Sequence, residues 1–490
     1  MGKPTGFLEI ARKDPGYRPG DERMHDWRAV ERLPSPADTQ EQAARCMDCG
    51  IPFCHGCGCP LANVIPEWND MVYRGRWRDA LELLLLTNPF PEFTGRICPA
   101  LCEGACVLGL NRDPVAIRSI ELAVIERGFT EGWMKPQPPA LRREEHVAVI
   151  GSGPAGLAVA QRLNQRGFQV MVYDAAAKPG GILRYGIPEF KLEKSIIDRR
   201  ISLMQAEGIQ FESGVIVGED VSLKFLRDRY DAICLAGGAR EPRDLQIPGR
   251  ELQGVHFAMD FLRQQNRRLE GEAISAAEEI LARGKHVVVV GGGDTGADCL
   301  GTSLRQGAAS VLQIEIMPEP PAKRAASTPW PAWPLMRRDS SSHKEGGTRR
   351  WSVSPKELLG KNGCVTGVRA IEVAWSTGPD GRPRMEERAG TTFDVPADLI
   401  LLAMGFTGPR KSRILETLGV QRDNRGNVTK DANNMTSATG VFAAGDMARG
   451  ASLVVRAMAD GLATAEGIER YLDEVQTSQR RVSSGADAAV

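Results

Sequence analysis

The sequence has no excess charge of either sign, no long apolar run and few histidines. Lys plus Arg number 62, as do Asp plus Glu, so nothing in the composition suggests binding to nucleic acid or to an anionic membrane. No stretch of about 18 apolar residues occurs, which excludes a membrane-spanning helix. The first residues also lack the apolar segment of a signal peptide. We therefore expect a cytoplasmic protein with no nucleic-acid or membrane partner.

Several catalytic signatures are missing too. The chain has no nucleophile elbow, no Walker loop and no zinc-protease helix, and its six histidines show no metal-site spacing. We therefore assign no catalytic side chain. At 490 residues the chain is long enough for about three domains.

Cysteines, in contrast, are abundant and unevenly spread. Eight of the 11 fall in one segment: Cys46, Cys49, Cys54, Cys57, Cys59, Cys98, Cys102 and Cys106. In a reducing compartment such a density favours metal binding over disulfides. Thiolates at these spacings hold iron–sulfur clusters, and structural zinc is the main alternative. The remaining three, Cys234, Cys299 and Cys364, stand alone and are expected to be buried packing residues.

A strand–glycine–helix unit begins at His146. A short apolar strand, residues 147–150, leads into Gly-Ser-Gly-Pro-Ala-Gly and an amphipathic helix. The three glycines permit the tight turn, the approach of a diphosphate and close helix–strand packing, while the helix N-terminus offers free N–H groups. An acidic residue ends the next strand, where it can accept hydrogen bonds from a ribose. The predicted contacts are Gly151, Gly153, Pro154, Ala155, Gly156 and Asp174.

A second unit of the same kind begins near residue 285. Its predicted contacts are Gly291, Gly293, Asp294, Thr295 and Gly296. Glu315, near the end of the following strand, favours NAD, because a carboxylate there would repel a 2′-phosphate. Arg305, Lys323 and Arg324 could instead supply positive charge for NADP. The residues leave this choice open.

A proline-rich segment, residues 317–351, lies inside the second unit. We interpret it as an ordered surface excursion or as a contact with a partner or cofactor, because long loops in compact domains are often functional.

The closing segment, residues 439–446, resembles the C-terminal flavin signature of two-dinucleotide flavoproteins, in which the Asp contacts the ribityl chain. The loop over residues 178–188 also matches that family, in which it lines the flavin. This resemblance places FAD in the first unit and implies flavin contacts from Gly181, Leu183, Arg184, Gly445 and Asp446.

Over residues 40–470 the chain resembles the small (beta) subunits of bacterial glutamate synthases and the N-terminal half of dihydropyrimidine dehydrogenase. The resemblance implies two [4Fe–4S] clusters with interleaved ligands. One set would be Cys46, Cys49, Cys54 and Cys106, and the other Cys59, Cys98, Cys102 and Glu121.

The chain departs from the family pattern in three places. Two residues are missing between Cys98 and Cys102 relative to many relatives. An extra residue between Cys54 and Cys59 brings in Cys57 as an alternative ligand, although Pro60 after Cys59 favours Cys59. The usual Tyr-Arg-Arg after the second strand of the nicotinamide unit is replaced near Glu315, which leaves NADPH and NADH both open.

The predicted fold is α/β: a helical iron–sulfur domain (residues 1–145), then two Rossmann-like domains, the second inserted in the first. FAD would bind residues 146–280 and 406–490, and NAD(P)H residues 281–405. The resemblance implies that NADPH reduces FAD and that electrons pass to a large alpha subunit, which makes L-glutamate from L-glutamine and 2-oxoglutarate. The alternative is an NAD(P)H–ferredoxin or sulfide-dehydrogenase-like subunit.

Overall fold

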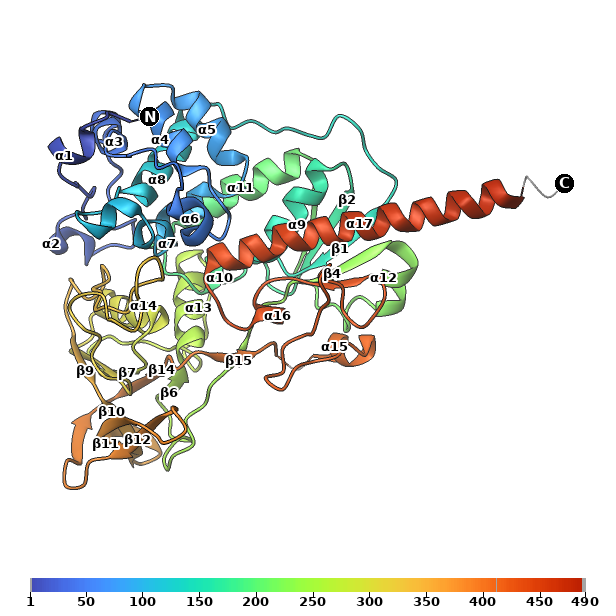
Figure 1. Cartoon of the computed structure of the whole chain (residues 1–490). Coiled ribbons are helices and arrows are strands. Elements are labelled where there is room, and N and C mark those ends of the chain that lie inside the picture. The colour runs from blue at the N-terminus through green and yellow to red at the C-terminus, as the bar shows by residue number, and fades with distance from the viewer. Residues whose placement is uncertain (1, 411, 487–490) are drawn as a thin grey trace.

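The N-terminal part of the chain folds into short helices around their own apolar core (Figure 1). The computed structural model describes residues 2–410 and 412–486. Helix α5 illustrates the cause, because Trp77, Ala80, Leu81 and Leu84 recur at helical spacing and are all buried. The elements are α1 (Gly6–Glu9), α2 (Gly20–Arg23), α3 (Pro36–Ala43), the π-helix η1 (Cys54–Gly58), α4 (Ile65–Tyr73), α5 (Trp77–Leu85), α6 (Pro91–Ile97), α7 (Leu101–Gly104), the 3-10 helix η2 (Val107–Leu110) and α8 (Ile117–Thr130).

A parallel five-stranded sheet in the order β16-β4-β1-β2-β3 forms the first dinucleotide unit. Helix α17 lies along α9 and projects beyond the sheet (Figure 1). A Cβ at Gly461 would stand 2.5 Å from the carbonyl oxygen of Ala155, so glycine allows this close helix pairing. The elements are β1 (His146–Ile150), α9 (Pro154–Gln165), β2 (Gln169–Asp174), α10 (Ile182–Tyr185), α11 (Lys194–Ala206), β3 (Gln210–Ser213), α12 (Leu223–Arg229), β4 (Ala232–Leu235), α15 (Arg413–Leu418), β16 (Val441–Ala443), α16 (Asp446–Arg449) and α17 (Val454–Ala486).

The second unit is a separate parallel sheet in the order β6-β14-β7-β8-β9. The chain enters and leaves it through two strands that pair with each other, β5 and β15. Because β16 returns to pair with β4, the second unit is inserted in the first, which confirms the predicted fold. The elements are β5 (Glu241–Pro242), β6 (Val255–Phe257), α13 (Ala258–Leu269), β7 (His286–Val290), α14 (Asp294–Arg305), β8 (Ser310–Glu315), β9 (Thr348–Trp351), β14 (Leu399–Leu402) and β15 (Phe406–Gly408).

The second sheet begins earlier in the chain than the sequence indicates. Strand β6 pairs with β14, and α13 packs into the same core as β7, so both belong to the inserted unit although they precede residue 281. A strand of three residues without a glycine motif carries no pattern that sequence reasoning can recognise. We therefore propose that the inserted unit starts near residue 250.

An antiparallel extension of the inserted unit has no counterpart in the sequence analysis. It comprises β10 (Val353–Lys361), β11 (Cys364–Thr377), β12 (Pro383–Glu387) and β13 (Phe393–Pro396). Of the isolated cysteines, Cys234 and Cys299 are buried as expected, whereas Cys364 is exposed at the start of β11. Within the described ranges, no helix combines the length and apolar character needed to cross a membrane.

Candidate functional site

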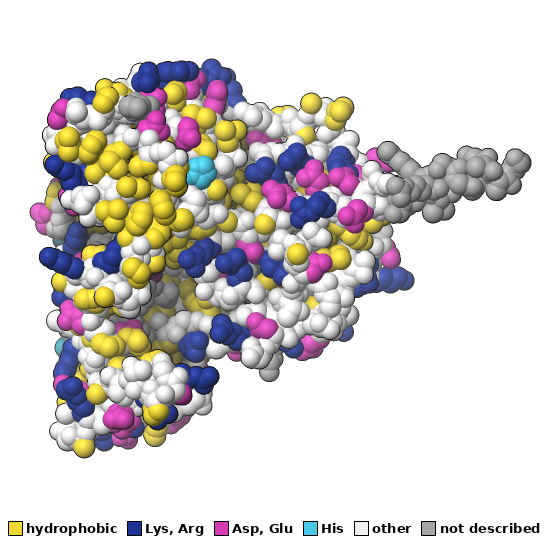
Figure 2. Space-filling model, viewed as in Figure 1, with side chains coloured by type: hydrophobic (Ala, Val, Ile, Leu, Met, Phe, Trp, Pro, Cys, Tyr) yellow, Lys and Arg dark blue, Asp and Glu magenta, His cyan; other side chains and the backbone are white. Residues whose placement is uncertain are grey.

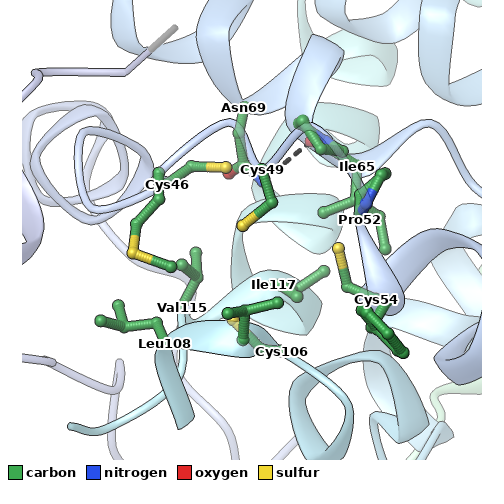
Figure 3. Close-up of a pocket in the computed structure, with 14 residues that line it drawn as sticks. Cys46, Cys49, Pro52, Cys54, Ile65, Asn69, Cys106, Leu108, Val115 and Ile117 are labelled. Carbon is green, nitrogen blue, oxygen red and sulfur yellow. Dashed lines mark hydrogen bonds between the residues drawn. The ribbon is translucent and has the colours of Figure 1, made fainter. Parts of the chain in front are cut away.

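Four of the predicted cluster ligands surround one pocket in the N-terminal domain. Cys46 and Cys49 come from the segment before η1, Cys54 is the first residue of η1, and Cys106 precedes η2 (Figure 3). The rest of the lining is largely apolar, and includes Ile65. Residues 60 positions apart in the sequence are thus brought together in the combination that the family resemblance implies.

The other four predicted ligands form a second group. The pKa of the Cys98 thiol is raised to about 12 by burial and by its neighbours Glu121 and Cys59. Burial, then Cys59 and further acidic neighbours, raises the pKa of Cys102. The thiols of the first group influence one another in the same way, because burial and Cys106 raise the pKa of Cys54. The eight residues therefore separate into two sets of four.

The chemistry of both groups fits a bound cluster. Buried thiols close to one another carry a penalty for ionisation, and burial raises the pKa of Cys46 to about 12 and that of Cys59 to about 11. Coordination to iron would relieve this penalty, because metals bind the thiolate. No three His, Cys, Asp or Glu side chains among the described residues lie close enough to share a single metal ion. Thiolates at the sequence spacings of these cysteines are typical ligands of iron–sulfur clusters.

The alternative ligand Cys57 lies apart from both groups. It is exposed on η1, whereas Cys59 packs against the core beside Cys98. The position of Cys59 therefore favours it over Cys57 as a ligand.

Glu121 is a buried carboxylate on α8 with polar neighbours on three sides. It accepts hydrogen bonds from Thr94 Oγ1, Asn63 Nδ2 and Asn88 Nδ2. Burial raises its pKa to about 7. Proximity to Cys59 and Cys98 fits a carboxylate ligand of the second group.

The first glycine loop, residues 151–156, has the geometry of a diphosphate cradle. A Cβ at Gly156 would stand 1.9 Å from the carbonyl oxygen of Gly151, so helix α9 packs directly on the turn. A Cβ at Gly153 would instead meet nothing within 4 Å, which leaves the space that a diphosphate needs. Asp174 accepts a hydrogen bond from the N–H of Ser152 at 2.8 Å and lies beside this space.

The predicted flavin loop lies against the same cradle. Gly181 has φ +53°, and a Cβ there would stand 2.7 Å from the Cα of Gly153. The N–H of Gly180 donates to Ser152 Oγ at 2.9 Å. Leu183 is buried in the core, and the buried Arg184 forms ion pairs with Asp198 and Glu270. Arg184 thus orders the loop through protein contacts.

The closing segment returns to this cradle from the far end of the chain. A Cβ at Gly445 would stand 2.6 Å from that of Ala155, so the two segments touch. Asp446 begins α16, accepts a hydrogen bond from Ser452 Oγ at 2.7 Å, and has its pKa raised by burial. Asp460, which the sequence analysis missed, accepts the N–H of Gly445 and pairs with Lys430. No local motif marks Asp460, because its role depends on the packing of α17.

The second glycine loop, residues 291–296, repeats the first. A Cβ at Gly293 would meet nothing within 4 Å, and Asp294, Thr295 and Gly296 open helix α14. Glu315 accepts the N–H of Gly292, as Asp174 accepts that of Ser152. Gln313 donates to the Gly291 carbonyl oxygen.

His343 stabilises this loop through Gln313, and the sequence analysis did not predict this role. Its Nδ1 accepts the N–H of Ser340, so the ring is neutral and Nε2 donates to Gln313 Oε1 at 2.8 Å. Burial and the neighbouring Arg349 lower the pKa of His343 to about 4. The histidine thus fixes the glutamine that in turn holds the Gly291 carbonyl.

The basic residues proposed for a 2′-phosphate occupy different places. Arg305 is 1% exposed, forms an ion pair with Glu345, and stacks on Phe190. Arg324 donates to the carbonyl oxygens of Thr328, Ala332 and Gly104. The structure therefore brings neither to the second glycine loop as a free cation.

The two dinucleotide units face each other across a hollow that Lys and Arg side chains border (Figure 2).

The apolar core of the first unit also includes Leu101 of the N-terminal domain and Leu183 of the flavin loop. Cys59 and Cys98 pack against the same core. The second cysteine group is thus connected to the flavin cradle by continuous protein packing.

Two family profiles match the chain. The profile of the pyridine nucleotide-disulphide oxidoreductases covers residues 145–461. The profile described as dihydropyrimidine dehydrogenase domain II, 4Fe-4S cluster, covers residues 23–133. The glutamate synthase (NADPH) small chain of Mycobacterium tuberculosis is 53% identical over 476 residues, 96% of each chain. This chain belongs to the glutamate synthase small-chain family. The family combines an oxidoreductase domain for FAD and a nicotinamide nucleotide with a 4Fe-4S domain.

Other relatives define the extent of the family resemblance. The glutamate synthase (NADH) of Schizosaccharomyces pombe is 44% identical over 480 residues, which cover 96% of this chain but 23% of that protein. Among solved structures, Mycobacterium tuberculosis FprA in complex with NADPH aligns with a TM-score of 0.54 at 20% identity, over 70% of this chain and 89% of FprA. This second likeness concerns the fold of the two dinucleotide units.

Proposed function

We propose that this chain is the small subunit of a glutamate synthase. It oxidises NADPH at FAD and passes the electrons through iron–sulfur clusters to a large subunit, which makes L-glutamate from L-glutamine and 2-oxoglutarate. The observation that carries the proposal is the 53% identity to a glutamate synthase small chain across 96% of both proteins. The Schizosaccharomyces pombe relative supports a much larger partner, because the matching segment is only 23% of that longer chain.

The two glycine loops supply the binding and orientation that such a reaction needs. Gly153 and Gly293 leave space for the two diphosphates, and Asp174 and Glu315 stand beside them for the riboses. When bound, FAD accepts the hydride and the iron–sulfur clusters carry single electrons. Hydride transfer between stacked rings requires no acid or base from the protein, which agrees with the lack of any catalytic motif.

We further propose two [4Fe–4S] clusters. Cys46, Cys49, Cys54 and Cys106 would hold one, and Cys59, Cys98, Cys102 and Glu121 the other. The separation of these buried and half-buried residues into two groups supports this assignment. The apolar core shared by Cys59, Cys98 and Leu183 supports placing the second cluster next to the flavin.

Anaerobic titration of the purified chain with NADPH, and separately with NADH, tests the hydride site. Bleaching of the flavin by NADPH is the expected result, and no bleaching by either nucleotide would contradict the proposal. Partner dependence is tested next: the chain alone should reduce an artificial dye but form no glutamate. Adding the large subunit should restore glutamate formation from L-glutamine and 2-oxoglutarate. Glutamate formed without that subunit would contradict the assignment of roles.

A further inference from the structure

Arg338 is a cation without an acidic partner beside the second glycine loop. It lies in the segment of residues 317–347 that connects β8 to β9, and its side chain is exposed. Its guanidinium stacks on the ring of Trp333 at 4.1 Å. No carboxylate in the described ranges lies within ion-pairing distance of it, whereas its neighbour Arg337 pairs with Glu319.

Main-chain and side-chain contacts hold Arg338 near the second glycine loop. Its carbonyl oxygen accepts a hydrogen bond from Arg349 of β9, and Arg349 lies opposite Gln313 of β8, which donates to the Gly291 carbonyl oxygen. Partial desolvation and the neighbouring Arg324 lower the pKa of Arg338, and Asp294, the first residue of α14, opposes them. A cation without an acidic partner among the described residues thus lies close to the loop at which Gly293 leaves open space and helix α14 presents free N–H groups.

The N-terminal domain holds this segment in position. Trp333 packs on Gly104 so closely that a Cβ there would stand 3.0 Å from its ring. Arg324 donates to the Gly104 carbonyl oxygen at 2.9 Å, and Trp330 packs against Phe53 with tilted rings whose centroids are 4.5 Å apart. Arg338 thus packs on Trp333, which in turn packs against the N-terminal domain.

We propose that Arg338 binds the diphosphate of the nicotinamide nucleotide and that the N-terminal domain positions it through Trp333. The proposal rests on the proposed function, since it requires a nicotinamide nucleotide on the second glycine loop. A guanidinium offers paired donors that match phosphate oxygens, and the loop and α14 provide the opposite wall. The nucleotide site therefore includes Arg338, a residue that the N-terminal domain holds in position.

The test measures the dissociation constants of NADP⁺ and NAD⁺ for the holoenzyme by quenching of protein fluorescence. Neither oxidised nucleotide can reduce the flavin, so binding is measured without turnover. Arg338→Met should weaken both nucleotides about tenfold or more, as expected for a lost charged hydrogen bond, and Arg338→Lys should weaken them less. Arg337→Met is the matched control and should leave both constants unchanged. Trp333→Leu should reproduce part of the loss, and Trp333→Tyr should retain binding.

Each other outcome has a distinct meaning. A loss for NADP⁺ alone would place the contact at the 2′-phosphate and overturn the diphosphate assignment. Unchanged binding in Arg338→Met would overturn the proposal while leaving the proposed function intact. Normal binding in Trp333→Leu would overturn the role of the N-terminal domain. Failure of the unmodified holoenzyme to bind either nucleotide would overturn the proposed function itself, and this inference with it.

Discussion

The carboxylate of Glu315 accepts a hydrogen bond from the main-chain N–H of Gly292 at 2.5 Å. Its second oxygen accepts the N–H of Met317 at 2.8 Å, so the side chain is fixed at the edge of the second glycine loop. A carboxylate held there suits a ribose hydroxyl and disfavours a 2′-phosphate. Glu315 therefore opposes the use of NADPH, and we expect it to set how strongly the enzyme discriminates between the nucleotides.

We predict that Glu315→Gln raises the preference for NADPH over NADH about five- to tenfold, which corresponds to about 1 kcal/mol. The amide oxygen can still accept the N–H of Gly292, whereas the bond from the N–H of Met317 is lost, so the change removes the charge and keeps the contact with the glycine loop. The measurement is the ratio of kcat/KM for the two nucleotides in dye reduction. Glu319→Gln, a nearby exposed carboxylate, is the control. An unchanged ratio in Glu315→Gln would show that its charge does not reach the 2′ position.

The glycines that face open space should each control one cofactor. Gly153→Val is expected to abolish FAD binding, because its side chain would occupy the space left for the diphosphate. Gly293→Val should retain FAD but lose flavin bleaching by NADPH, for the same reason at the other loop. Flavin content and anaerobic titration of the two variants check this. Loss of FAD in Gly293→Val would argue against separate sites.

Replacement by serine should lower the iron and sulfide content of the protein at Cys59 but not at Cys57. Cys59→Ser is expected to remove one cluster, and therefore about half of the iron and labile sulfide, because Cys59 lies with Cys98 and Glu121. Cys57→Ser should keep the full content, since Cys57 is exposed and apart from both groups. Iron and sulfide analysis of anaerobically purified protein is the measurement. The reverse pattern would assign the ligand to Cys57.

Glu345 should contribute strongly to stability. Its carboxylate is fully buried and pairs with both Arg23 of the N-terminal domain and Arg305 of α14, which are 5% and 1% exposed. Glu345→Gln would leave two buried guanidinium groups without a counter-charge, at a cost of about 3–5 kcal/mol. Urea unfolding measures the loss. Glu319→Gln should cost less than about 1 kcal/mol, because its ion pair with Arg337 is exposed.

His343 should make the nicotinamide unit sensitive to acid. Its pKa is lowered to about 4 by burial, so below the ordinary value of 6.5 the unfolded chain binds a proton that the folded chain does not. Stability therefore falls as the pH drops from about 6.5 towards 4, by about 1 kcal/mol after allowance for the solvated part of the ring. Urea unfolding at pH 7 and pH 5.5 measures this fall. The fall should be smaller in His343→Gln, and an equal fall would exclude the histidine as its cause.

The two glycine loops could be predicted because each is written locally, and the density of cysteines predicted a metal site, whereas the division of the ligands into two sets came from the family resemblance. A strand, three glycines and a helix occupy about 20 consecutive residues, and their backbone geometry dictates what they can bind. The resemblance to two-dinucleotide flavoproteins also implied that the second unit is inserted in the first. The pairing of β16 with β4 confirms this.

Only the tertiary structure decided the contacts that join distant segments. No local signature in the sequence marks the three-residue strand β6, the ion pairs of Glu345 with Arg23 and Arg305, or the packing of Trp333 on Gly104. The same holds for Arg338, whose lack of an acidic partner is a property of its surroundings. The sequence by itself determined which cofactor classes the chain can bind, because backbone turns and thiol spacings are local. The fold decided which charges are left unpaired and which domain supports each site, because those depend on packing between residues hundreds of positions apart.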